Sequence, residues 1–352
     1  MTFLHRVFWS SWCLILAIAL WLIPISHKSV GYAGVYSASP NFKITATNLS
    51  PHLLISPSPY QSSLANLNEN SFTSPVWAVS DGSSVARLNS GLDNVRQQNY
   101  QQALIDFTDV INLNEDLVGA AYSDRCLVNL QLQQYNSAKS DCLAALEYDR
   151  DNKEAYLNLG LSYYYLQEYQ QAIAQYRQVI KRDRHDYRAY YNLGLSHSAL
   201  KDYQQAKSDY NLALMSSDSI PTERQTLIYN ERGIANIMLA NYQRAIADLN
   251  QAIDLKASND SAYFNRGCAH HQQGNYLAAI DDFTQVVQLN PSQTQAYVNR
   301  AILHHQLRQE RAAFKDLDIA LQQYQQQGDR AAYQQILNLQ QVMIQSQATQ
   351  IA

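Results

Sequence analysis

Two pairs of adjacent histidines are the residues of this chain whose type and spacing could most readily do chemistry. His270-His271 and His304-His305 lie 34 residues apart, and imidazole is a common metal ligand. No Asp, Glu or Cys accompanies them at a recognised ligand spacing, although Cys268 lies nearby in the sequence. We therefore expect neither a metal nor a cofactor. A metal site at His271 and His305 is kept as the alternative to ordinary packing of the rings.

A pair of cysteines offers a second chemistry. Cys126 and Cys142 lie 16 residues apart. One interpretation is that both are small apolar core residues. The other is a disulfide, which would require an oxidising compartment.

No motif indicates catalysis. The chain has no Walker loop, nucleophile elbow, HExxH or CxxC motif. Residues 149–152 have the residue types of a calcium loop but lack its turn glycine. The net charge is -4 and no run of Lys or Arg forms a basic face, which argues against nucleic acid as a partner. We expect a protein that is not an enzyme.

The N-terminus indicates export or membrane anchoring. Arg6 precedes an apolar stretch over residues 7–25, close to the ~20 residues that span a bilayer. Gly31-Tyr32-Ala33 would suit cleavage after Ala33. Residues 1–33 are therefore either a cleaved signal peptide or a retained signal anchor. We expect the rest of the chain outside the cytoplasm, in a periplasm or, in a photosynthetic host, a thylakoid lumen.

Residues 34–83 are rich in Ser, Pro and Asn, as in Ser56-Pro57-Ser58-Pro59. Such a composition buries too little apolar surface to offset the entropy of ordering the chain. We predict a disordered linker over this range.

The remainder of the chain repeats itself. An alanine, called here the anchor alanine, recurs at spacings of 34 to 39 residues, and a small residue stands 12 positions before each one. The anchor alanines are Ala103, Ala138, Ala172, Ala206, Ala245, Ala279 and Ala313.

Each repeat has two apolar stretches of helical period separated by a short polar turn, which predicts two antiparallel helices. Small residues allow close crossing of the helices, and aromatic residues fill the remaining space. One pair cannot bury its apolar face alone, so stacked pairs form a solenoid. We predict seven pairs over 84–328 and a capping helix over 329–346, with Ala332, Ile336, Leu339 and Met343 on its apolar face.

The repeat resembles the tetratricopeptide repeat (TPR). Tyr190-Tyr191-Asn192-Leu193-Gly194 and Tyr203-Gln204-Gln205-Ala206 match its pattern closely. Residues 263–267 look like a variant common in bacterial TPR proteins, and the export segment suggests an exported or membrane-anchored member. Only Pro291 supplies the expected repeat-ending proline, and Arg87 replaces an aromatic residue in the first repeat. The resemblance implies an all-α, right-handed superhelix.

The resemblance also implies a binding surface, because the first helix of each TPR pair lines the concave side. At the matching positions this chain carries apolar and aromatic residues, and no lysine to grip a C-terminal carboxylate. The predicted groove residues are Leu157, Leu161, Tyr164, Tyr191, Leu195, Ile234, Ile237, Phe264, Val298 and Ile302.

These observations predict a scaffold, adaptor or assembly factor that holds a protein or peptide client in an apolar-aromatic groove. Two alternatives stay open. One is a self-associating structural protein, and the other is a metal-responsive or redox-responsive protein that uses the His or Cys pairs.

Overall fold

The structure is a computed structural model that describes residues 84–113, 117–216 and 219–351. The predicted export segment (1–33) and linker (34–83) lie outside the described residues. Within the described ranges, no helix combines the length and the apolar character needed to cross a bilayer.

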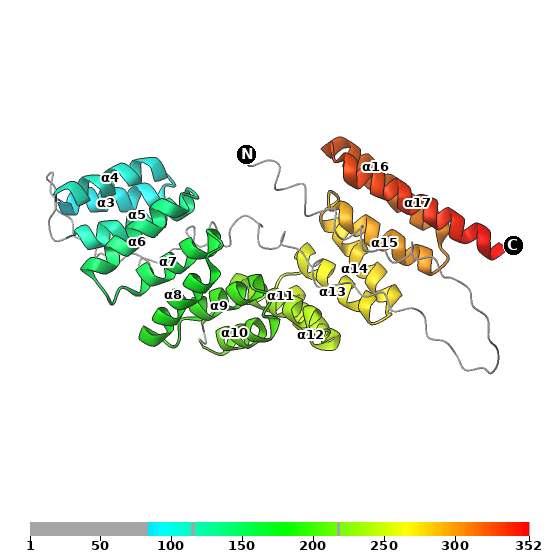
Figure 1. The fold of residues 1–352 in the computed structure, drawn as a ribbon, viewed down its shortest axis with the longest axis horizontal. Helices are drawn as coiled ribbons and strands as arrows, with labels where there is room; N and C mark the ends of the chain where they lie inside the picture. The colour runs from blue at the N-terminus through cyan, green and yellow to red at the C-terminus, as the bar shows by residue number, and fades with distance from the viewer. Residues whose placement is uncertain (1–83, 114–116, 217–218, 352) are drawn as a thin grey trace, which may run out of the picture. The chain divides into compact units, whose positions relative to one another are not determined.

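The described residues form fifteen helices and no strands, which confirms the predicted all-α fold (Figure 1). The helices are α3 (Ser84–Arg96), α4 (Tyr100–Leu113), α5 (Val118–Gln131), α6 (Tyr135–Tyr148), α7 (Lys153–Tyr165), α8 (Tyr169–Arg182), α9 (Tyr187–Ala199), α10 (Tyr203–Met215), α11 (Thr222–Met238), α12 (Tyr242–Leu255), α13 (Asp260–Gln272), α14 (Tyr276–Leu289), α15 (Thr294–Gln306), α16 (Glu310–Gln327) and α17 (Arg330–Ile351).

The helices follow one another as seven pairs, α3–α4 through α15–α16, and α17 follows the last pair. In each pair the first helix is called helix A and the second helix B. The described chain divides into a first unit, residues 84–235, and a second unit, residues 236–351. In the first unit α3 to α10 each pack against the next helix in sequence, and α10 shares a buried cluster with α11. In the second unit the same consecutive packing runs from α12 to α17.

The crossing of helix A and helix B has the same construction in most pairs. The small residue of helix A faces the side chain four positions after the anchor alanine of helix B. A Cβ atom added to Gly91 would lie 2.5 Å from a ring carbon of Phe107, and Gly160 and Gly194 face Tyr176 and Tyr210 as closely. The sequence predicts that Gly194 meets Ala206 at this crossing. The atoms nearest to a Cβ placed on Gly194 belong to the ring of Tyr210, and Ala206 is buried in the same cluster. The bare backbone of the glycine leaves room for the flat ring.

The turn between helices A and B always places one residue in the left-handed region. Its φ is 63° at Gln167 and 80° at Gly274. Only glycine adopts this conformation without a steric cost. The same turn position holds a residue other than glycine in six pairs: Gln98, Gln133, Gln167, Lys201, Ala240 and Arg308.

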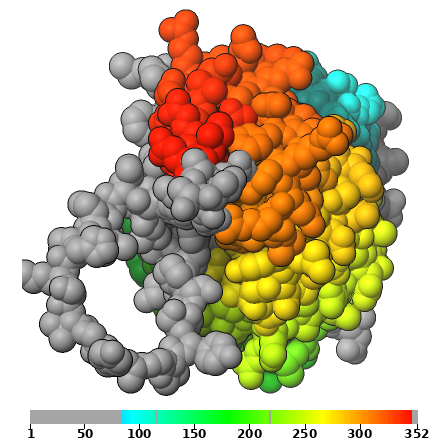
Figure 2. Space-filling model, turned by 90° about the vertical axis from the view of Figure 1, so that its right-hand side faces the viewer, coloured from blue at the N-terminus to red at the C-terminus, as the bar shows by residue number. Residues whose placement is uncertain are grey.

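Helix α17 covers the end of the last pair, beside α16 (Figure 2). Ala332, Ile336, Leu339 and Met343 are buried against residues of α15 and α16, while the glutamines on the opposite side, such as Gln341, are exposed. A polar outer face is what a terminal helix of a stack needs. The helix extends to Ile351, beyond the predicted limit at residue 346.

Candidate functional site

Six of the ten predicted groove residues lie in the core rather than on an open surface. Leu157 packs among residues of α8 and α9, and Tyr191 packs on the ring of Tyr210. Val298 is fully buried against α16 and α17. The physical reason is that these positions face the paired helix B as well as neighbouring helices, such as α8 and α9 around Leu157 and α16 and α17 around Val298. The six buried residues are Leu157, Leu161, Tyr191, Leu195, Ile237 and Val298.

The other four predicted residues remain partly exposed. In the first unit these are Tyr164 and Ile234, and in the second unit Phe264 and Ile302. Tyr164 meets Tyr165 edge to face, and Phe264 meets Phe283 in the same way. These rings are held in place by neighbouring rings while part of their surface stays accessible.

A buried polar position lies on helix A two residues before the small residue. It is asparagine in five pairs, including Asn192 and Asn265, which are both almost fully buried. In α5 and α11 the same position holds Asp124 and Glu231. Burial raises the pKa of Asp124 from 3.8 to about 7 and that of Glu231 from 4.5 to about 7. Two carboxyl groups therefore occupy sites that suit an uncharged amide.

The histidines are engaged by separate partners. His271 meets Tyr276 edge to face, and burial lowers its pKa. His197 Nδ1 lies 2.6 Å from Asp209 Oδ2. The described residues contain no group of three or more His, Cys, Asp or Glu side chains placed to hold a metal ion.

His305 joins three helices at the C-terminal end. Its Nδ1 lies 2.8 Å from Glu310 Oε2, and its Nε2 lies 3.2 Å from Ser346 Oγ. Glu310, His305 and Ser346 are linked in the order acid, imidazole and hydroxyl, as in the catalytic triad of a hydrolase. However, Ser346 donates its proton to the Met343 carbonyl and lies within a helix. Helical N–H groups are already bonded along the helix, so none remains for an oxyanion. The arrangement fastens α17 to α15 and α16.

The two cysteines are joined. Cys126 and Cys142 form a disulfide between α5 and α6, with their Cα atoms 5.3 Å apart. Both residues are fully buried. Of the two interpretations of the sequence, the structure contains the disulfide.

A guanidinium clamp that the sequence analysis missed links neighbouring pairs. In the first unit, Arg125 donates two hydrogen bonds to Asp141 on its own helix B, and a third, of 3.0 Å, to Thr108 Oγ1 on the preceding helix B. Its guanidinium also lies over the ring of Tyr122. Bidentate bonds of this kind are the stronger class of ion pair. In the second unit the same arrangement joins Arg266 to Asp282 and Asn250, and Arg300 to Asp316 and Thr284.

The seven repeats compared with one another contain the signal for this clamp. The residue three positions after the anchor alanine is aspartate in six of the seven repeats, and all six are buried. The exception is Gln175. An arginine stands 16 residues before four of the aspartates, whereas that position holds Ser90 and Leu193 in the repeats of Asp106 and Asp209, and Leu159 in the repeat of Gln175. The six aspartates are Asp106, Asp141, Asp209, Asp248, Asp282 and Asp316.

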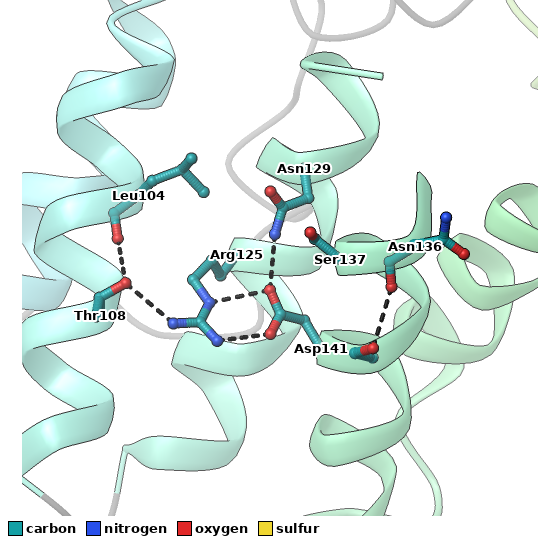
Figure 3. A pocket seen from close by; sticks show the side chains of 8 residues that line it. Leu104, Thr108, Arg125, Asn129, Asn136, Ser137 and Asp141 are labelled. Atoms are coloured by element: carbon teal, nitrogen blue, oxygen red, sulfur yellow. Dashed lines mark hydrogen bonds and ion pairs between the residues drawn. The ribbon is translucent and has the colours of Figure 1, made fainter. Parts of the chain in front are cut away.

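A hollow of about 490 Å³ opens beside the first of these clamps (Figure 3). It lies between the helices B α4 and α6, with Arg125 and Asn129 of α5 between them. Asn129 donates to the same Asp141 carboxylate at 2.8 Å. The remaining lining residues are Leu104, Thr108, Asn136, Ser137 and Ser140. The hollow therefore offers hydroxyl and amide groups around a neutralised ion pair.

Comparisons with known proteins identify the repeats. Models described as tetratricopeptide repeat match residues 157–220 and 261–293, and one described as TPR repeat matches 241–274. No curated protein sequence matches this chain.

Solved structures with the same fold share little sequence with this chain. A tetratricopeptide repeat protein from Parabacteroides merdae is 17% identical with a TM-score of 0.55, covering 73% of this chain and 100% of its own. The C-terminal part of a TPR repeat-containing protein from Cytophaga hutchinsonii is 15% identical, with a TM-score of 0.55 and coverages of 66% and 94%. Pseudomonas aeruginosa pilF is 20% identical, with a TM-score of 0.53 and coverages of 63% and 98%. The helix pairs within residues 157–220 and 241–293 are therefore tetratricopeptide repeats, and the described chain has the fold of a TPR solenoid.

Proposed function

We propose that this chain is a protein-interaction scaffold that binds a segment of a client protein, and we assign it no catalytic step. Tetratricopeptide-repeat proteins are generally interaction scaffolds, because stacked pairs create extended surfaces. The hollow between α4 and α6 is the observation that supports a binding site for this client segment.

The chemistry of the hollow favours an uncharged, hydrogen-bonding client segment. The charge of Asp141 is matched by Arg125, so the floor carries no net charge. Ser137 and Ser140 offer hydroxyl groups at an exposed rim. A main chain in extended form, or side chains such as Ser and Asn, would match these groups. Such binding should weaken only slightly in salt, since few charges are there to be screened.

The four inner-face residues that remain partly exposed are the second candidate surface. Tyr164 and Ile234 in the first unit, and Phe264 and Ile302 in the second, present apolar area that a client with Leu, Phe or Tyr side chains would cover. Aromatic anchors often dominate the energy of an interface.

Crosslinking in the native host followed by pull-down distinguishes the two surfaces. Ser140→Tyr places a bulky ring in the hollow, and Ser208→Tyr makes the same change at the equivalent position of α10 as the matched control. Tyr164→Ala and Phe264→Ala test the inner face. We expect Ser140→Tyr alone to release the client. If only the inner-face variants release the client, the binding site is on the inner face. If all the variants fold normally and keep every partner, both candidate surfaces are refuted.

A second copy of this chain among the captured proteins would instead support self-association. Sedimentation of the purified protein at several concentrations tests this directly, because a self-associating chain increases in apparent mass with concentration. The scaffold proposal requires a different protein in the crosslinked product.

We infer that the repeats work outside the cytoplasm, exported or anchored by residues 1–33. Two observations support this location. One is the apolar stretch at residues 7–25. The other is the Cys126–Cys142 disulfide, since disulfides persist in oxidising compartments. Reporter fusions after residue 84 test it: an exported reporter should be active there, and activity of a cytoplasmic reporter would overturn the inference.

A further inference from the structure

The crossing inside the α5–α6 pair is filled differently from the others. The residues at the crossing stand 16 apart in each pair, and elsewhere they combine a very small residue with a large one. Gly91 faces Phe107 in α3–α4, and Gly267 faces Phe283 in α13–α14. In both cases the ring is fully buried. An apolar side chain thus supplies the contact that holds helix A to helix B.

In α5–α6 the same two positions hold Cys126 and Cys142, and a covalent bond takes the place of the ring. The two cysteine side chains together contain fewer heavy atoms than one phenylalanine side chain. When the bond is broken, the two sulfur atoms must move apart to van der Waals distance inside a fully buried site. Reduction therefore both loosens the crossing and leaves it with less apolar contact than the Gly–Phe pairs have.

The consequence reaches beyond this pair. Arg125 and Asp141 directly neighbour the two cysteines in the sequence, so the clamp depends on the same crossing. In a stack each pair touches only its neighbours. Helices α3 and α4 contact the rest of the first unit through α5, so they lose their support when α5–α6 loosens.

We infer that the Cys126–Cys142 disulfide is a redox lock on helices α3–α6, closed by oxidation and opened by a dithiol reductant, while α8–α10 stay folded. This inference is independent of the proposed client. In the opening step a thiolate of the dithiol attacks one cysteine sulfur and forms a mixed disulfide. Its second thiol then displaces the protein sulfur. Two electrons and two protons pass to the cysteines, and the reductant leaves as a disulfide.

Because both sulfur atoms are buried, attack must wait for local opening of the pair. Opening by reductant should therefore be slow in the folded protein. A small dithiol such as dithiothreitol reduces the full-length protein for comparison with the oxidised form. Alkylation followed by mass measurement shows when reduction is complete.

Amide hydrogen exchange on the full chain tests the lock, in a Cys13→Ser, Cys268→Ser background so that Cys126 and Cys142 are the only cysteines left. Reduction should speed exchange in α3–α6 by about tenfold or more, given the usual effect of closing a loop of this length, and leave α8–α10 unchanged. Helix α7 is left out of this comparison, because its Leu159 and Leu161 pack directly on the cysteines. The same result is expected for Cys126→Ser with Cys142→Ser in the absence of reductant.

The matched control replaces the disulfide with the glycine–phenylalanine contact that is found in α3–α4 and α13–α14. Cys126→Gly with Cys142→Phe should protect α3–α6 equally with and without dithiol. Complete reduction that leaves exchange in α3–α6 unchanged would overturn the lock. Loosening of the whole chain, α13–α16 included, would overturn its confinement to these helices. Both outcomes are read on the Cys13→Ser, Cys268→Ser protein, so the result stands even where the Gly–Phe variant does not fold.

Discussion

Replacing Asp124 with asparagine should stabilise the protein at neutral and alkaline pH. Asp124 is almost fully buried in α5, and its Oδ2 has no hydrogen-bond partner in the structure. The same position of five other A helices holds an amide: Asn89, Asn158, Asn192, Asn265 and Asn299. Asparagine has nearly the shape of aspartate, so the change removes a charge without opening a cavity.

The magnitude follows from the two protonation states. Burial raises the pKa of Asp124 from 3.8 to about 7, so the folded protein holds this proton more tightly than the unfolded chain does. Stability is fully present below the unfolded pKa and is lost as pH rises toward the folded pKa. At 1.36 kcal/mol per pKa unit, the loss at pH 8 is at most about 4 kcal/mol. Asp124→Asn should recover about 1 to 4 kcal/mol there and much less at pH 4.

Urea unfolding followed by circular dichroism at pH 4, 6 and 8 measures this difference. Asp281→Asn, which neutralises an exposed aspartate of α14, is the control and should change little. An Asp124→Asn variant no more stable than the parent at pH 8 would refute the reasoning. So would a difference between the two proteins that stays constant from pH 4 to pH 8.

Three further changes test the packing by the same unfolding assay. Gly194→Ala should cost about 1–3 kcal/mol, because its methyl group overlaps the facing tyrosine ring. Gln167→Gly should add about 0.5–1 kcal/mol, because it relieves a left-handed residue at a turn. Asp316→Ala should cost about 2–3 kcal/mol, since it leaves the Arg300 guanidinium, 15% exposed, without its carboxylate. Adding Arg300→Leu should restore most of that loss. An unchanged midpoint in any of these would count against the contact concerned.

Much of the fold could be predicted because the packing contacts repeat along the sequence. The spacing of anchor alanines such as Ala206 located both helices of each pair. The apolar stripe of α17 was predicted for the same reason, since a helix of period 3.6 with one apolar side must cover a core.

The binding surface could not be predicted to the same degree. Leu157 and Val298 were expected on an open groove, and both are buried. Helical periodicity shows which side of helix A a residue lies on, but not how closely the neighbouring helices approach that side. That distance depends on the contacts between pairs, such as the bond from Arg125 to Thr108, and these connect residues of different repeats.

The guanidinium clamp has a consequence for how such an array can evolve. A clamp arginine follows only a repeat whose helix B presents Thr or Asn five positions after its anchor alanine, as Arg232 follows Asn211 at 2.7 Å. The repeats after Leu143 and Arg177 carry leucine instead. A repeat that carries a clamp arginine, inserted after Arg177, would place two guanidinium groups at one junction. Repulsion between them would destabilise that junction, so the order of the repeats limits which rearrangements of this array are tolerated.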